Sequence, residues 1–291
     1  KKITFQATPR MSSYLLALVA GEMDRIHAVA GGTDIGVDMI KGKADQGRYA
    51  LDAAAQLLPY YVDYFGIAYP LPKLDLIAVP GNFAAGAMEN WGAITFIDSA
   101  LLFDPAHSGP RTRESVYEVI AHEMAHQWSG DLVTMGWWSD NWLNEGFASW
   151  MAAKAADHFN PSWHVWLRAH DDKELAMETD ARPTTHPIEQ PLADESAIAD
   201  AFDSITYDKG ESFLRMLEDY LGADAFRDGM RRYMKAHAYS NTTSADLCTA
   251  LEAASGKPFA RFAAGFTRQP GVPLVHVATR CDGNETSVTL T

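Results

Sequence analysis

The chain has few of the features that would assign it to several large classes of protein. Its only cysteines, Cys248 and Cys281, match no metal-binding spacing, so we expect two free thiols and no disulfide framework. No apolar run approaches the roughly 20 residues that span a bilayer. Basic residues are also scarce: 24 Lys and Arg against 38 Asp and Glu give a net charge of −14, which argues against nucleic-acid partners.

What remains is the composition of an ordinary globular protein, with 47% hydrophobic and 21% charged residues. A chain of 291 residues can bury one sizeable core. The chain begins with Lys1 and has no signal-type apolar core, so we expect a piece of a longer protein. The compartment (cytoplasmic, periplasmic or secreted, in each case soluble) and the oligomeric state stay open.

Hydrophobic periodicity predicts β-structure up to about residue 42, including the apolar run Ser13–Gly21, and then a helix over 45–65 that Pro59 should kink or restart. Strands are predicted at 74–79 and 93–97. The rest is mainly helical, with helices predicted at 112–129, 144–158, 162–178, 209–221, 223–237, 244–255 and 258–267, and strands at 274–278 and 286–290.

One motif carries the chemistry. In His122-Glu123-Met124-Ala125-His126, the two histidines are four residues apart, so on a helix their imidazoles converge on one cation. Glu145 follows after eighteen residues and begins a second helical pattern. Two imidazoles and one carboxylate, with a fourth position for water, form the ligand set of a catalytic zinc site. This pentapeptide is a known metalloprotease signature.

The alternative is that the motif is a solvated helix face with satisfied side chains. The flanking residues argue against this, because Ile120, Met124 and Trp128 predict a largely buried helix in which unpaired imidazoles are costly. Zinc lowers the pKa of its bound water toward about 7. Glu123 has the position of the general base that completes the deprotonation.

Four ordered motifs then resemble the aminopeptidase N family of gluzincin zinc metallopeptidases. They are Gly86-Ala87-Met88-Glu89-Asn90, the histidine motif, Glu145, and Ile205-Thr206-Tyr207-Asp208-Lys209-Gly210. Thr8-Pro9-Arg10-Met11-Ser12 also fits. The resemblance runs through essentially the whole chain.

The resemblance implies a role for each matching position. His122, His126 and Glu145 would bind one zinc ion per chain, Glu123 would activate water, and Tyr207 would stabilise the oxyanion. In the segment Gly86-Ala87-Met88-Glu89-Asn90, Glu89 would bind the free α-ammonium of a peptide substrate, and the backbone would pair with the extended peptide. The implied activity is that of an aminopeptidase acting on peptides with a free N-terminus.

The implied fold is α/β (α+β), with a thermolysin-like catalytic domain made of a small mixed sheet and a mainly helical subdomain, flanked by partial β-domains. We expect residues 1–42 to be the tail of an N-terminal β-domain, 43–269 the catalytic domain, and 270–291 the start of a β-sandwich. The resemblance implies that the family's other substrate-binding parts lie outside this chain. We therefore expect the 291-residue chain to bind zinc with weak or no peptidase activity alone.

The chain departs from the family pattern at Thr95-Phe96-Ile97-Asp98, where Thr-Tyr-Arg-Glu is frequent, and the small Ala85 predicts a roomy first pocket. Side-chain preference therefore stays open. The sequence leaves three rival functions. An endopeptidase of thermolysin type would leave Glu89 without a purpose. An epoxide hydrolase would resemble the leukotriene-processing relatives, which tend to carry Gly at the position of Ala87. A catalytically silent peptide-binding protein would normally have lost a ligand or the base.

Overall fold

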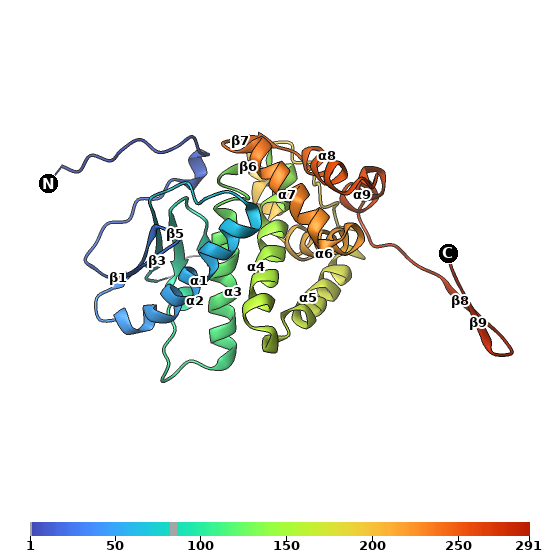
Figure 1. Cartoon of the computed structure of the whole chain (residues 1–291), viewed down its shortest axis with the longest axis horizontal. Coiled ribbons are helices and arrows are strands. Elements are labelled where there is room, and N and C mark those ends of the chain that lie inside the picture. Colours follow the sequence, from blue (N-terminus) through green and yellow to red (C-terminus); the bar gives the residue numbers. More distant parts are fainter. Residues whose placement is uncertain (1, 82–85) are drawn as a thin grey trace.

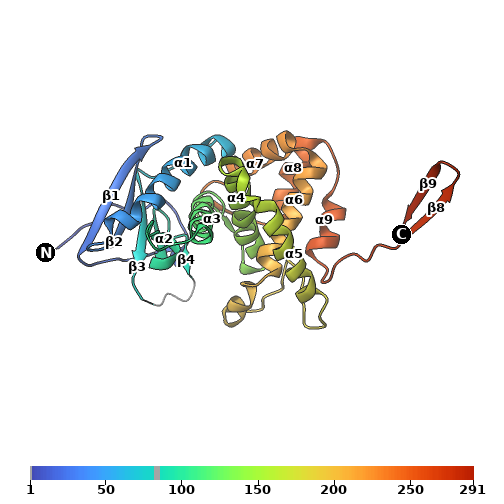
Figure 2. The same cartoon turned by 90° about the horizontal axis from the view of Figure 1, so that it is seen from below.

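The structure is a computed structural model that describes residues 2–81 and 86–291. A small mixed sheet lies at one end of the main body and a mainly helical part at the other (Figures 1 and 2). The predicted fold class, α/β with a small mixed sheet followed by a helical subdomain, is confirmed. The prediction for the first pocket concerned Ala85, which lies outside the described residues.

Over the described residues, the sheet has five strands in the order β1-β2-β3-β5-β4. β1 and β2 are antiparallel, β2, β3 and β5 are parallel, and β4 pairs antiparallel with β5 at the edge. A parallel pair needs a long crossover connection, and helix α1 (Arg48–Phe65) supplies it between β2 and β3. The strands are β1 (Met23–Ala30), β2 (Thr33–Ile40), β3 (Lys73–Val79), β4 (Ala87–Met88) and β5 (Ala93–Ile97).

The remaining helices follow the predicted order closely. They are α2 (Asp98–Leu101), α3 (Pro110–His126), α4 (Glu145–Phe159), α5 (Val165–Asp180), α6 (Gly210–Leu221), α7 (Ala223–His237), α8 (Ser244–Ser255) and α9 (Ala260–Thr267). Short 3₁₀ turns lie at Ser13–Leu15, Ala44–Gly47, Trp138–Leu143, Pro161–Trp163 and Glu195–Ala201. A π-helical turn, hereafter the π-turn, spans Ile205–Lys209. The other strands are β6 (Val133–Met135), β7 (Ser240–Thr242), β8 (Val277–Asp282) and β9 (Glu285–Leu290).

An aromatic core joins α1 to α3 and α4. Phe65, at the end of α1, stacks on Trp128 with ring centroids 5.3 Å apart and lies 6.0 Å from Phe147 of α4. All three rings are buried. The hydroxyl of Tyr61 donates a 2.7 Å hydrogen bond to the carbonyl oxygen of Ala121, so α1 and α3 are tied by a polar contact as well. This packing fixes the end of α3, where the histidine motif lies.

The predicted strand at Ser13–Gly21 is wrong. Ser13–Leu15 forms a 3₁₀ turn, and Leu16 and Leu18 are exposed. Leu15 is buried, and its carbonyl oxygen accepts a hydrogen bond from the side chain of Asn90. The segment is therefore held by a contact with a residue distant in sequence, which an apolar run does not reveal.

Two further sequence predictions are corrected. Pro59 lies inside α1, which continues without a restart. Its neighbours Leu57, Leu58 and Tyr61 are buried, and this tertiary packing outweighs one missing hydrogen bond. The first C-terminal strand begins at Val277 and ends at Asp282, later than predicted, because it pairs in register with β9 around a turn at Gly283.

The three-part division of the chain stays a prediction. The sheet itself runs across residue 42, because β2 pairs directly with β3, which favours placing residues 23–40 with the catalytic unit. The hairpin of β8 and β9 is exposed along its whole length and projects away from the helices (Figure 1). In the described part of the chain, we find no helix whose length and apolarity would let it cross a membrane.

Two glycines let α4 approach the π-turn closely. A Cβ on Gly146 would lie 2.9 Å from the carbonyl oxygen of Thr206 and 3.0 Å from the Cα of Gly210. Gly210 faces the same contact from the other side, where a Cβ would lie 3.3 Å from the Cα of Gly146. Neither helix backbone can come this near if a side chain intervenes. This contact fixes the distance between the π-turn and the start of α4.

We expect Gly146→Ala to lower the free energy of unfolding by about 1–3 kcal/mol, because the new methyl group meets backbone atoms that cannot move aside alone. Denaturant unfolding measures the change. Gly265→Ala in α9 is the control: a Cβ there meets nothing within 4 Å, so this helical substitution should be neutral or stabilising. Equal stability of Gly146→Ala and the wild type would contradict the close contact.

Candidate active site

Two histidines lie one turn apart at the C-terminal end of α3. That helix starts with Pro110 at its first position, where a missing N–H costs nothing, and its last two turns carry His122 and His126. Their Nε2 atoms are 3.0 Å apart. His126 is fully buried and His122 is partly buried at the bottom of a cavity. The helical spacing therefore brings the imidazoles together as the sequence predicted.

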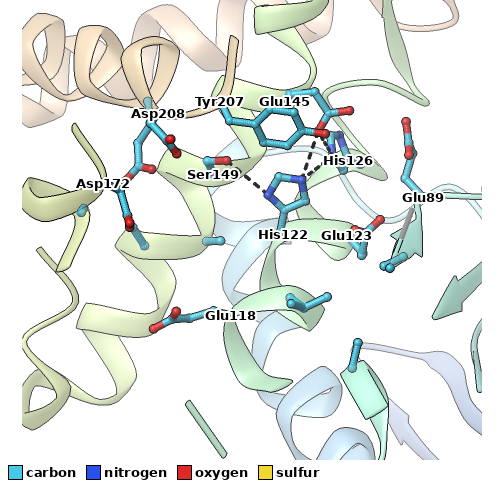
Figure 3. A pocket seen from close by; sticks show the side chains of 18 of the residues that line it. Glu89, Glu118, His122, Glu123, His126, Glu145, Ser149, Asp172, Tyr207 and Asp208 are labelled. Atoms are coloured by element: carbon cyan, nitrogen blue, oxygen red, sulfur yellow. Dashed lines mark hydrogen bonds and ion pairs between the residues drawn. The ribbon is translucent and has the colours of Figure 1, made fainter. Parts of the chain in front are cut away.

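Glu145 completes a triangle with the histidines. It is the first residue of α4 and is buried. Its Oε2 lies 3.2 Å from Nε2 of His122 and 3.4 Å from Nε2 of His126. Ligand atoms bound tetrahedrally to one zinc ion are about 3.3 Å apart, given bond lengths of about 2.0–2.1 Å. The three atoms are thus spaced as ligands of a single ion (Figure 3).

The surrounding hydrogen bonds also fit a metal ion. Nδ1 of His126 faces the carbonyl oxygen of Ser129 at 3.1 Å, which requires an N–H at Nδ1 and leaves the Nε2 lone pair directed into the triangle. The side-chain amide of Asn144 donates to Oε1 of Glu145 at 3.3 Å. These partners orient the ring of His126 and the carboxylate of Glu145. The residues present therefore fit a divalent metal ion.

Electrostatics at the triangle reflect a carboxylate between two imidazoles. Burial alone would raise the pKa of Glu145, but His126 and His122 outweigh it and hold that pKa well below its ordinary value. Burial acts to lower the pKa of His126, but the carboxylates of Glu89 and Glu145 together raise it. The pKa of His122 is lowered, chiefly by burial. Burying these ionisable side chains together costs free energy unless they are paired or coordinate a metal ion.

Glu123 points to the same place from the neighbouring position on α3. Its carboxylate is buried, and within the described residues its Oε2 has no hydrogen-bond partner. Carboxylate oxygens of Glu123 and Glu89 and a ring nitrogen of His126 all lie within 4.8 Å of one another. Burial raises the pKa of Glu123 well above its ordinary value, and the carboxylates of Glu89 and Glu145 raise it further. The carboxylate of Glu123 therefore lies beside the histidines and Glu89.

Tyr207 is carried by the π-turn and covers the triangle from the other side. Its ring stacks on that of His122, with centroids 6.0 Å apart and planes 9° from parallel (Figure 3). Burial raises the pKa of Tyr207, as does the carboxylate of Glu145, so its hydroxyl stays protonated. A π-turn adds one residue to a helix and re-aims its side chains, and such turns are frequent at functional sites.

Glu89 follows the edge strand β4. That strand is held by two pairs with β5, and the N–H of Ile97 donates to the carbonyl oxygen of Gly86 at 2.7 Å. Glu89 is buried, and its Oε1 accepts hydrogen bonds from the Tyr14 hydroxyl at 3.3 Å and from the Asn144 side chain at 3.1 Å. The carboxylate is thus held in place at the rim of the metal site.

Asn90 has a different environment from the other residues of its motif. Its side-chain amide donates to the carbonyl oxygen of Leu15 at 3.2 Å, and its Oδ1 accepts a 2.8 Å bond from Thr95. Both polar ends are used within the protein. The substrate-binding role expected for Asn90 stays a prediction, and its contacts show a brace that holds the segment Ser13–Leu15 against β5.

Three contributors to the site were not expected from the sequence. Tyr14 lies between Glu89 and Trp138, whose ring centroid is 5.3 Å from its own. Gln127 donates to the carbonyl oxygen of Glu89 at 3.0 Å and accepts from the N–H of Gly92 at 2.9 Å, so it joins α3 to β4. Asn144 bridges Glu89 and Glu145. Only the positions of Gln127 and Asn144, each adjacent to a metal-site residue, could have signalled them.

One cavity of about 600 Å³ is lined by the candidate residues Glu89, His122, Glu123, His126, Glu145 and Tyr207. It begins at Gly86–Glu89, passes His122, His126 and Glu145, and continues to a group of acidic side chains. Three of these, Asp172, Asp208 and Glu211, come from α5, the π-turn and α6 (Figure 3 labels the first two). Burial and the carboxylates of Asp208 and Asp172 raise the pKa of Glu211 to about 8. Burial likewise raises the pKa of Asp208 to about 6.

This fold and the convergence of two histidines with a glutamate define the class of the HExxH metallopeptidases. Comparison with known proteins then identifies the family. A model of the Peptidase family M1 domain matches residues 49–266. The chain belongs to peptidase family M1, and the resemblance to aminopeptidase N is confirmed.

Individual relatives cover almost the whole chain. Aminopeptidase M1 of Arabidopsis thaliana is 44% identical over 276 residues, which are 94% of this chain and 31% of the relative. Puromycin-sensitive aminopeptidase of Caenorhabditis elegans is 43% identical over 100% of this chain and 31% of the relative. Tricorn protease-interacting factor F2 of Thermoplasma acidophilum is 44% identical over 95% of this chain and 35% of the relative. The chain spans about a third of the length of these curated relatives.

The raised pKa of Glu211 predicts a stability that depends on pH. Because its folded-state pKa is about 8 against an ordinary 4.5, wild-type stability should fall as the pH rises from about 4.5 to 8. Glu211→Gln removes this ionisation, so its melting temperature should match the wild type near pH 4 and exceed it at pH 8. Asp171→Asn, an exposed neighbour on α5, should show no such trend. A parallel pH dependence of wild type and Glu211→Gln would refute the argument.

Proposed function

We propose that the protein carrying this chain is a zinc-dependent aminopeptidase that hydrolyses the N-terminal peptide bond of peptides. The observation that carries the proposal is the joint position of the ligand triangle and Glu89 in one cavity, with no more than a few ångströms between Glu89 and His126. Aminopeptidase is also the word in the names of most of the relatives described above. We infer the same activity for this protein.

Two imidazole nitrogens and one carboxylate oxygen, spaced about 3 Å apart, suit zinc in number, type and geometry. His122, His126 and Glu145 would hold it, one ion per chain. A bound zinc ion supplies Lewis acidity to the scissile carbonyl group and to the attacking water. Ser129 and Asn144 would keep the ligands oriented.

The chain's own residues would handle the protons and the developing charge. Glu123 would accept a proton from the attacking water and pass it to the leaving amine, because its free Oε2 is buried beside the ligand triangle. The Tyr207 hydroxyl would donate a hydrogen bond to the oxyanion from the opposite side. The two groups flank the space where the scissile carbonyl would lie.

Glu89 would select substrates with a free amine. Its buried carboxylate, oriented by Tyr14 and Asn144, offers a charge-assisted hydrogen bond to an α-ammonium group. The neighbouring backbone of Gly86, Ala87 and Met88 belongs to a sheet edge, where an extended peptide could add as a further strand. An endopeptidase would have no use for a buried carboxylate at this place.

We expect Glu123→Gln to keep one zinc ion per chain but to lower kcat by a factor of about 10²–10⁴, because the base is lost and the ligands are untouched. Glu145→Gln should lose the zinc as well. Metal analysis and hydrolysis of an alanyl reporter amide by the complete protein measure both effects. Glu178→Gln, exposed on α5, is the matched control. Full activity in Glu123→Gln would exclude its role as the base.

Glu89→Gln should lower kcat/KM about 10- to 100-fold for a peptide with a free N-terminus, mainly through KM, because a charged hydrogen bond becomes a neutral one. The N-acetylated form of the same peptide should resist both the wild type and the variant. Liquid chromatography of the products measures these rates. Efficient internal cleavage of the acetylated peptide would support an endopeptidase instead.

A further inference from the structure

The cavity has a second end, on the side of the metal site away from Glu89. Glu118, His122 and His126 follow at i, i+4 and i+8 on one face of α3 and all line the cavity. Glu89 lies beside His126. Glu118 lies one turn, about 6 Å, before His122 along the helix axis. The metal site therefore separates a Glu89 end from a Glu118 end (Figure 3).

The Glu118 end is lined by an excess of carboxylates. Asp172, Asp208 and Glu211 all line this part of the cavity, and in the described residues none of them makes an ion pair. The nearby cations are engaged elsewhere. Arg168 is paired with Glu114 and Glu118. The guanidinium of Arg215 lies 4.1 Å from the centroid of the Trp166 ring.

Glu211 provides the strongest evidence that this end of the cavity suits a cationic group. Its Oε1 is buried, and among the described residues it has no hydrogen-bond partner. Burial and the neighbouring carboxylates raise its pKa to about 8 against the opposing effect of Arg215, so ionising this carboxyl group costs free energy. A cationic group placed here would remove that cost for Glu211 and Asp208 together.

The spacing of the carboxylates selects the kind of cation. Within the described residues, two groups of side chains have ligand atoms close enough together for one metal ion. They are His122, His126 and Glu145, and Glu89, Glu123 and His126. Asp172, Asp208 and Glu211 form no such cluster, so they do not converge on a point charge. They line a path instead, which suits the long side chain of lysine or arginine with several hydrogen-bond donors.

We propose that this end of the cavity binds a lysine or arginine side chain at one of the two substrate positions that follow the scissile bond. The proposal rests on the proposed aminopeptidase function, in which Glu89 holds the first amine and thereby fixes the direction of the peptide. The residues beyond the scissile carbonyl then extend past His122 toward Glu118 and the three carboxylates. Since each extended residue spans about 3.3–3.6 Å, the second or third residue reaches them.

The test compares peptides Ala-Xaa-Ala-Ala and Ala-Ala-Xaa-Ala, with lysine, norleucine or glutamate at Xaa, as substrates of the complete protein. At one of the two positions, kcat/KM for lysine should exceed that for norleucine about tenfold, and glutamate should be the poorest. The ratio should fall with added salt, because the cavity is open to solvent. Norleucine matches the apolar stem of lysine, so the ratio isolates the charge.

Variants then assign the preference to these carboxylates. The double variant Asp208→Asn with Glu211→Gln should reduce the lysine-to-norleucine ratio to about 1–2, and Asp172→Asn alone, exposed at the mouth, should reduce it about twofold. Asp171→Asn removes an equal charge from the same helix away from the cavity, and it should leave the ratio unchanged. Circular dichroism shows whether each variant is folded. If the double variant does not fold, the Asp172→Asn variant tests the assignment in its place.

The outcomes separate the two proposals. An alanyl reporter amide has no residue after the scissile bond, so its cleavage tests the aminopeptidase function alone. Cleavage of this amide with equal rates for the lysine and norleucine peptides would overturn only the proposed basic preference. A lysine preference that survives in the carboxylate variants would also overturn it. Failure to cleave the amide and every peptide would overturn both.

Discussion

The structure depends on one constraint, which is that three polar side chains from two helices meet at a single point inside an aromatic core. His126 and Glu145 are buried, and their ligand atoms lie 3.4 Å apart. Without a cation, such a cluster costs free energy. The folding of this region and its affinity for metal are therefore linked. Phe65 packs on both Trp128, after α3, and Phe147 of α4, and so links the two helices. The hydrogen bonds of Ser129 and Asn144 orient His126 and Glu145 at the ends of these helices.

A second constraint, the contact between Gly146 and Gly210, turns a metal site into a cavity with two different ends. Because α4 and the π-turn touch through their backbones, Tyr207 lies over His122 and the carboxylates that follow it line the cavity beyond. Glu89 occupies the opposite end. The cavity is thus acidic on both sides of the histidines, although the groups at each end come from elements that are far apart in sequence.

Much of the fold could be predicted because long amphipathic helices and short apolar strands are local patterns. The helices 223–237 and 244–255 and the strand 93–97 have the predicted bounds. The misses share a cause. Ser13–Leu15 is held by Asn90, Pro59 is tolerated through buried neighbours, and β6 and β7 pair across more than a hundred residues. Each depends on contacts between residues that are far apart in the sequence, which local patterns do not reveal.

The sequence by itself determined that His122 and His126 face one point, because they lie at i and i+4 on a helix, and it offered Glu145 as the third candidate ligand. It also placed Glu89 and Tyr207 among the candidate residues through their motifs. Only the tertiary structure decided that Tyr14 and Gln127 brace Glu89, that a π-turn aims Tyr207, and that Asp172, Asp208 and Glu211 share one end of the cavity. The physical reason is range: helical periodicity is set by neighbouring residues, whereas a cavity wall is assembled by packing between elements far apart in the chain.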